Sequence, residues 1–96
     1  MEKVIGPEFR VGKNTDVNKL SSAIFTNMKN VEKLELKLIG AGALNQAIKS
    51  IAAARGISGS CGFDLVIRPS FQEISIQSEE KTAINLTIIK VPCGTI

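Results

Sequence analysis

The alternation of apolar and polar residues changes period several times along the chain. A short strand is expected over 8–11, where apolar residues alternate with charged ones. Apolar residues at helical spacing then predict an amphipathic helix over 16–29, with Thr15 or Asp16 as its N-cap. Alternating leucines over 31–39 predict a half-buried strand that has one charged face in water.

The second half of the chain follows a similar scheme. Residues 43–55 carry Leu44, Ala47, Ile48, Ile51 and Ala52 at helical spacing. Gly56 stands where a helix-terminating glycine is expected, before a Gly/Ser loop. A strand follows over 63–68, and Pro69 implies that the strand bends there or lies at a sheet edge. The remaining segments are an extended stretch, a polar hairpin tip and a last strand: 71–76, 77–81 and 84–88.

This β-α-β-α-β-β order predicts a single α+β domain with two layers. Each strand has one apolar face and each helix has one apolar stripe, so both helices are expected on one face of a four-stranded mixed sheet. The domain is expected over 8–91. Residues 1–7, punctuated by Gly6 and Pro7, are expected to form a flexible extension, and 92–96 a frayed tail.

Composition is that of an ordinary globular domain. The 96 residues are 44% hydrophobic and 22% charged. No apolar run approaches the roughly 18–20 residues of a membrane span. Residues 1–12 carry several charges and lack the apolar core of a secretory signal. We therefore expect a cytoplasmic location and no membrane partner.

The residue inventory argues against catalysis, metals and cofactors. The chain has no histidine, which excludes His-based triads and His metal ligands. Cys61 and Cys93 are too few for a zinc site or a disulfide framework, so ordinary reduced thiols are expected. The adjacent acids Glu79 and Glu80 lie on the expected hairpin tip, in water rather than in a dry pocket. We expect no catalytic residue, no metal and no cofactor.

The charge balance permits a nucleic-acid partner without requiring one. Twelve Lys and Arg against nine Asp and Glu give a net charge of +3. With four phenylalanines and neither Trp nor Tyr, the chain has few residues on which bases stack. Any contact with nucleic acid is therefore expected to involve phosphates more than bases, with little sequence specificity.

Five segments carry a resemblance to a known family. They are IGAGALNQAIK at 39–49, ARG at 54–56, GFDL at 62–65, PSF at 69–71 and EEKTAI at 79–84. Together they resemble the stage V sporulation protein S family in one register over nearly the whole chain. The resemblance implies an Alba-like two-layer fold and a role in sporulation or developmental regulation. It also implies binding of DNA or RNA as a homodimer or higher oligomer.

The turn before the second helix is the first candidate site. Gly40 and Gly42 flank Ala41 there, and the exposed N–H groups of a helix start, together with the helix dipole, suit a phosphate. A tight structural turn is the alternative interpretation. The wider Alba group carries Arg or Lys around this entrance, where this chain has Gly40, Gly42 and Gln46, so a phosphate contact here would rely on backbone N–H groups.

Several cations complete the candidate interface. In an Alba-like fold, Lys13 and Asn14 in the loop after the first strand lie at the same end as this turn, and Lys37 is expected to join them. Solvated loop residues are the alternative. Four further cations are expected to add positive field, or to act only as ion-pair or solubilising charges: Lys49, Arg55, Arg68 and Lys81.

Two functions follow from these observations. The first is a non-catalytic regulator that binds nucleic acid, mainly through phosphates, as a homo-oligomer. The second is a protein-interaction module whose oligomer recruits a regulatory partner without direct nucleic-acid binding. The second is motivated by the missing cations at the second helix's entrance and by Glu79 and Glu80, which would repel phosphate.

Overall fold

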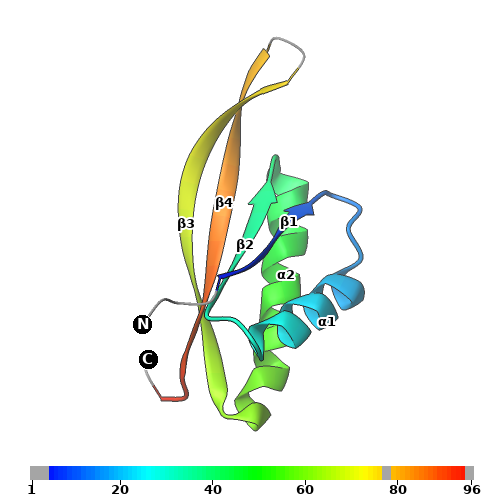
Figure 1. The fold of residues 1–96 in the computed structure, drawn as a ribbon. Coiled ribbons are helices and arrows are strands. Elements are labelled where there is room, and N and C mark those ends of the chain that lie inside the picture. Colours follow the sequence, from blue (N-terminus) through cyan, green and yellow to red (C-terminus); the bar gives the residue numbers. More distant parts are fainter. Residues whose placement is uncertain (1–4, 77–78, 95–96) are drawn as a thin grey trace.

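The computed structural model describes residues 5–76 and 79–94 and confirms the predicted order of elements (Figure 1). A single 3-10 turn, Gly59–Cys61, follows the second helix. The helices and strands are β1 (Ile5–Val11), α1 (Val17–Met28), β2 (Lys33–Leu38), α2 (Ala41–Ser58), β3 (Phe63–Ile76) and β4 (Glu79–Pro92).

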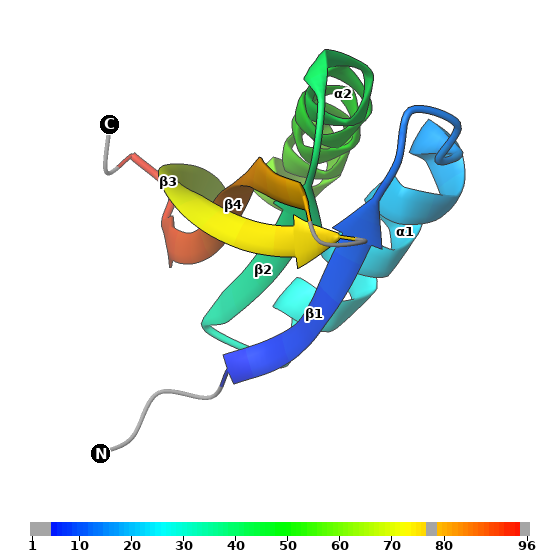
Figure 2. The same ribbon diagram turned by 90° about the horizontal axis from the view of Figure 1, so that it is seen from above.

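The four strands form one mixed sheet in the order β1-β2-β4-β3. β1 and β2 are parallel, because α1 carries the chain back between them, and the other neighbouring strands are antiparallel. Both helices cover the same face of the sheet, as Figure 2 shows from above. The predicted two-layer α+β architecture is confirmed.

The core lies between this sheet face and the two helices. Leu34, Leu36 and Leu38 of β2 are buried as their alternation predicted, which leaves the charged residues of β2 on the outer face. Ile24 and Met28 of α1 are fully buried against them. Each such side chain contributes about 1.5–3 kcal/mol on leaving water, so this stripe fixes how α1 sits on the sheet.

The β3–β4 hairpin projects beyond the rest of the molecule (Figure 1). Both strands are 14 residues long and pair without a break from Phe63–Pro92 to Ile76–Glu79. Pro69 pairs with Leu86 inside this ladder, so pairing continues through the proline. β3 is an outermost strand, which confirms the predicted edge position. β4 begins at Glu79, inside the expected hairpin tip over 77–81; residues 77–78 lie outside the described residues.

Helix α2 runs past its predicted end. It continues through Gly56 to Ser58, and the left-handed glycine of this region is Gly62, with φ 90°. Ala54 and Ser58 are fully buried, so packing against the sheet continues beyond the point where propensity alone would stop the helix. The expected termination at Gly56 is wrong for this reason.

The strands at both ends are longer than predicted. β1 begins at Ile5, so residues 5–7 of the expected flexible extension belong to the sheet, with a register shift between Ile5 and Glu8. A Cβ on Gly6 would lie 3.0 Å from Leu34 Cδ1, so this glycine permits close packing rather than a turn. β4 reaches Pro92, the first residue of the expected tail, and residues 1–4 and 95–96 lie outside the described residues.

Candidate nucleic-acid interface

The loop between β1 and α1 is closed by its own hydrogen bonds. The Gly12 N–H donates to Thr15 Oγ1 at 2.8 Å, and the Thr15 N–H donates to the Gly12 carbonyl at 3.1 Å. The next residue, Asp16, caps α1 by accepting from the Lys19 N–H at 3.0 Å. Lys13 and Asn14 therefore sit in a turn whose backbone is held on both sides.

The start of α2 leaves its first backbone donors without a side-chain cap. Gly40 is the N-cap residue, with φ 93° and ψ 158°, a conformation open essentially only to glycine. Its carbonyl accepts the first helical bond, from the Leu44 N–H at 3.1 Å. Gly40 has no side chain with which to cap the turn, so the N–H groups at this helix start stay available to an anion, at the positive end of the dipole.

The loop lies directly against this helix start. A Cβ built on Gly42 would lie 2.8 Å from Lys13 Cβ and 3.6 Å from Lys13 Cα. The Gln46 side-chain amide donates to the Thr15 carbonyl at 2.9 Å. Lys13 is exposed and forms no ion pair with any side chain in the described part of the chain. A cation without an acidic partner and uncapped backbone donors thus meet at one end of the fold.

Lys37 does not join this group. Because Leu36 and Leu38 face the helices, Lys37 faces the opposite side of the sheet. Its ammonium lies 3.6 Å from Glu8 Oε2 and donates to Gln72 Oε1 at 3.0 Å. The expectation that Lys37 converges with Lys13 is wrong, since strand alternation places the two on different faces.

The outer sheet face holds further cations, among them Arg68 and Arg10. Arg68 pairs with Thr87, which in turn pairs with Glu35 of β2, so all three belong to one outward row. Arg10 pairs with Lys37 in the neighbouring row and is exposed. Sequence reasoning missed Arg10, although its place between two inward-facing apolar residues of β1 was a usable signal.

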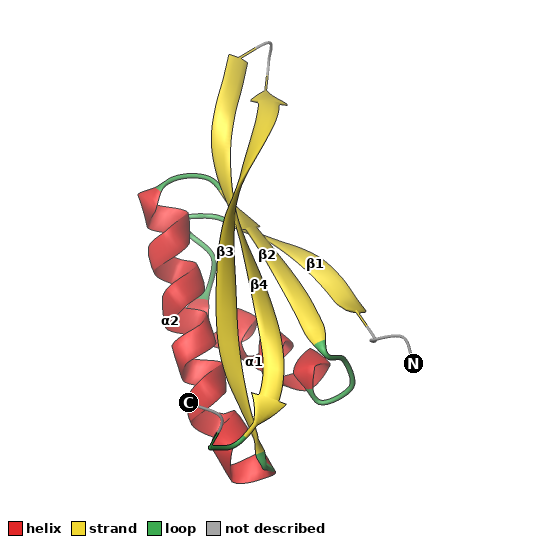
Figure 3. Ribbon diagram, turned by 90° about the vertical axis from the view of Figure 1, so that its left-hand side faces the viewer, coloured by secondary structure: helices red, strands yellow, loops and turns green. Residues whose placement is uncertain are grey.

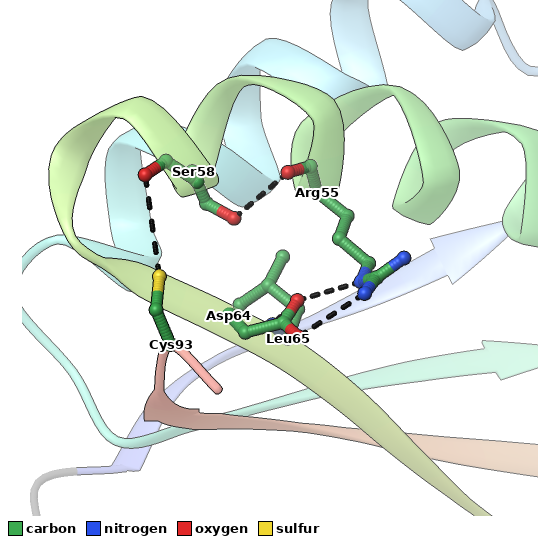
Figure 4. Close-up of polar contacts among 6 residues, drawn as sticks. Arg55, Ser58, Asp64, Leu65 and Cys93 are labelled. Carbon is green, nitrogen blue, oxygen red and sulfur yellow. Dashed lines mark hydrogen bonds and ion pairs between the residues drawn. The ribbon is translucent and has the colours of Figure 1, made fainter. Parts of the chain in front are cut away.

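Arg55, near the end of α2, is bound within the molecule (Figure 4). Its guanidinium forms a bidentate pair with Asp64, with Nε–Oδ1 and Nη2–Oδ2 distances of 2.6 and 3.1 Å. Asp64 also accepts from the Leu65 N–H at 2.8 Å. These hydrogen bonds lower the pKa of Asp64 and raise the pKa of Arg55, so each partner stays ionised and neutralises the other. The structure supports the ion-pair alternative for Arg55.

A shallow concavity of about 530 Å³ adjoins this pair. Cys93 contributes its thiol there (Figure 4), with Sγ 4.0 Å from the Gly59 carbonyl oxygen. Both cysteines, Cys61 and Cys93, are free and exposed. Among the described residues, no three potential metal ligands gather at one place. The concavity is lined by Ala52, Arg55, Gly56, Gly59, Asp64, Cys93 and Gly94.

The last two predicted cations lie apart from the loop. Lys49 is exposed on α2, pointing away from the buried face of the helix. The backbone of Lys81 pairs with Ile74 in the projecting hairpin, and its side chain lies outside the described residues. Of the candidate residues, the structure therefore brings together Lys13, Asn14, Gly40 and Gly42.

The apolar stripe of α2 is only partly buried. The helix buries mostly small residues, and Leu44 and Ile48, expected in the core, are 36% and 41% exposed. Small side chains let the helix lie close to the sheet, which leaves these longer ones at the flank. The Arg55–Asp64 pair shows that this same flank faces β3.

The neighbouring strand continues this exposed apolar flank. β3 and α2 run in opposite directions from the Arg55–Asp64 pair, which brings Ile67 alongside Ile48 and Phe71 toward the start of α2. Ile67 is 37% exposed and Phe71 is 78% exposed. We call Leu44, Ile48, Ile67 and Phe71 the α2–β3 apolar flank. Its exposure marks a surface suited to protein association.

The chain has an Alba-like fold. It is similar to Alba from Thermoplasma volcanium, with a TM-score of 0.61 and 16% sequence identity over 86% of this chain and 99% of that chain. At this identity the likeness is one of fold. The family model described as Stage V sporulation protein S matches residues 7–91, and the chain belongs to that family. None of the described helices combines the length and apolar character that a membrane span needs.

Proposed function

We propose that this protein is a non-catalytic, cytoplasmic regulator of the sporulation type that binds nucleic acid through phosphates as a homo-oligomer. The observation that carries the proposal is the packing of Lys13 against Gly42 at the uncapped start of α2. Family membership and the Alba-like fold support the same function.

The chemistry of this end suits a phosphate. An anion at a helix start gains from the dipole and from backbone N–H groups, and a lysine supplies a mobile point charge. Lys13 needs no acid to be displaced before it binds, in contrast to Arg55 and Lys37. We therefore assign the direct contacts to Lys13, Asn14 and the backbone at Gly40 and Gly42.

The other cations have a supporting role in this proposal. Lys49, Arg68 and Lys81 add to the positive field without converging on one phosphate. Lys37 and Arg55 are held by Glu8 and Asp64. The contacts in this proposal are with the backbone of the nucleic acid, because the chain has few aromatic residues on which bases stack.

The partner on the α2–β3 apolar flank is a second copy of this chain. Burying Leu44, Ile48, Ile67 and Phe71 between two copies removes apolar side chains from water at the centre of an isologous interface. Two copies then present two Lys13 loops, which bind one polymer more tightly than either loop alone.

Salt titration tests the phosphate contacts. Binding of a fluorescent DNA duplex, and of the matching RNA, is measured by anisotropy at increasing salt for the wild type, Lys13→Glu and Lys37→Glu. We expect the log–log slope of affinity against salt to fall by about 0.9 in magnitude for Lys13→Glu with duplex DNA, and to change little for Lys37→Glu. Absence of any complex at low salt would exclude nucleic-acid binding.

The assembly is tested with a matched pair of variants. Ile48→Glu places a charge in the apolar flank, whereas Ile57→Glu alters an equally accessible residue elsewhere on α2, 47% exposed. Light scattering should show that Ile48→Glu dissociates the oligomer and that Ile57→Glu does not. Equal behaviour of the two variants would contradict this choice of interface.

A protein-interaction module is the second candidate function. Phe71 is the most exposed large apolar residue among the described ones, and two of the candidate cations, Lys37 and Arg55, are paired with acids. This function predicts that Lys13→Glu leaves biological activity and partner binding unchanged. Loss of activity in parallel with loss of nucleic-acid binding would exclude it.

A further inference from the structure

We infer that Gly42 and Gln46 are positioning residues, which fasten the Gly12–Asp16 loop to α2 and so set where Lys13 meets its phosphate. The inference rests on the proposed function for the identity of the ligand. It concerns a contact between two elements that exists without the ligand. The two residues are one helical turn apart and lie on the same side of α2.

Gly42 acts through the side chain that it lacks. It lies within the first turn of α2 and its φ is not positive, so its backbone conformation does not require glycine. The close approach of Lys13 does require glycine, because a Cβ added to Gly42 would lie 2.8 Å from Lys13 Cβ. That atom is the root of the lysine side chain, so the clash is relieved only by a backbone shift that separates the loop from the start of α2.

Gln46 acts through a hydrogen bond. Its Nε2 donates to the Thr15 carbonyl at 2.9 Å in a part-buried position. Thr15 is also the residue that closes the turn onto Gly12, through both its hydroxyl and its N–H. The bond from Gln46 therefore fixes the turn that contains Lys13, although Gln46 itself carries no charge.

Together the two contacts hold the lysine before the ligand arrives. A cation on a fixed backbone loses less conformational freedom on binding than one on a mobile loop. The role of Gln46 is then to place the charge of Lys13, although its own side chain is neutral.

A double-mutant cycle on duplex DNA tests this role. Lys13→Ala, Gly42→Ala, Gln46→Ala and the double variant Lys13→Ala/Gly42→Ala are compared with the wild type by anisotropy. The control is Gly56→Ala, which makes the same change in the same helix where nothing lies within 4 Å. Circular dichroism verifies that each variant is folded.

The expected pattern is non-additive. Gly42→Ala and Gln46→Ala should each lose most of the affinity that Lys13→Ala loses, with the slope against salt reduced by up to about 0.9. Adding Gly42→Ala to Lys13→Ala should cost little more, and Gly56→Ala should bind as the wild type does. Wild-type affinity in Gly42→Ala and Gln46→Ala, or additive losses in the cycle, would overturn the positioning role.

Amide hydrogen exchange without nucleic acid separates this inference from the proposed function. Gly42→Ala and Gln46→Ala should speed exchange at the Gly12 and Thr15 N–H groups, and Gly56→Ala should not. If the wild type bound neither DNA nor RNA, the proposed function and the positioning of Lys13 for phosphate would both fall. Faster exchange would still establish the fastening contact, and unchanged exchange would overturn that as well.

Discussion

The two ends of α2 carry similar residues, but the cation at one end is paired with an acid and the cation at the other end is not. Each end has glycines and an adjacent cation: Gly40, Gly42 and Lys13 at the start, and Gly56, Gly59 and Arg55 at the finish. At the finish, Asp64 holds Arg55 in a bidentate pair. At the start, the helix has no side-chain cap and Lys13 has no acidic partner among the described side chains.

The difference shows that a glycine next to a cation does not by itself make an anion site. Both ends of α2 combine glycine with a cation in the sequence. At the end of the helix Asp64 binds the cation, whereas at its start no side chain caps the backbone N–H groups. The helix dipole adds to the contrast, because its positive end is at the start. Arg55, at the negative end, instead joins α2 to the beginning of β3.

Gly40→Ala should have the largest effect on stability. The φ of 93° and ψ of 158° are strained for any residue with a Cβ, so we expect a loss of about 1–3 kcal/mol in the free energy of unfolding. Chemical denaturation measures it. A loss below experimental error would show that the start of α2 rearranges without penalty, and that its geometry is not fixed.

The two cations should differ in nucleic-acid affinity. Lys13→Gln should weaken duplex binding by about tenfold, the worth of one charge-assisted hydrogen bond. Arg55→Gln should leave affinity nearly unchanged, because Asp64 already neutralises that guanidinium. Anisotropy at fixed low salt is the measurement, and equal losses in both variants would remove the contrast between the two ends.

Gly56→Ala should raise the free energy of unfolding, whereas Gly40→Ala should lower it. Gly56 lies inside the helix with open space around it, so alanine fits and restricts the unfolded chain. We expect a gain of about 0.4–1 kcal/mol, seen as a raised melting temperature. A destabilised variant would contradict the open surroundings of Gly56 on which this expectation rests.

Asp64→Asn should have the smallest effect on stability, and the effect should be present only at pH values where the Asp64 carboxyl is ionised. The lowered pKa of Asp64 means that the folded state favours the carboxylate, so its contribution is present above the ordinary aspartate pKa of 3.8. That contribution is lost as the pH falls through the lowered pKa. Thermal melts should show the wild type more stable than Asp64→Asn near neutrality, with the difference shrinking below about pH 4.

The sequence predicted the features that follow from the local spacing of apolar residues. It did not predict the features that follow from contacts between distant elements. The alternation of Leu34, Leu36 and Leu38 was sufficient to place β2 and its buried face. The same alternation, applied to Lys37, would have placed it on the outer face and away from Lys13. Lys37 was expected near Lys13 because it lies near the end of β2, but which face of the sheet its side chain occupies was not taken into account.

The end of α2 and its exposed stripe were beyond local reasoning. Gly56 has the composition of a helix stop, and only the burial of Ala54 and Ser58 against the sheet explains why the helix continues. Leu44 and Ile48 are apolar at helical spacing, but the sheet accepts the smaller residues beside them. For the candidate site, Lys13 and Gly42 were identified by type, whereas their contact and the part of Gln46 required the fold.

β1 and β3 are the outermost strands of the sheet (Figure 3). Each contains a proline, Pro7 in β1 and Pro69 in β3. A proline offers no N–H to an incoming strand, so neither border is a continuous template for another chain. Two molecules that meet edge to edge therefore cannot continue one sheet across both of them along its full length.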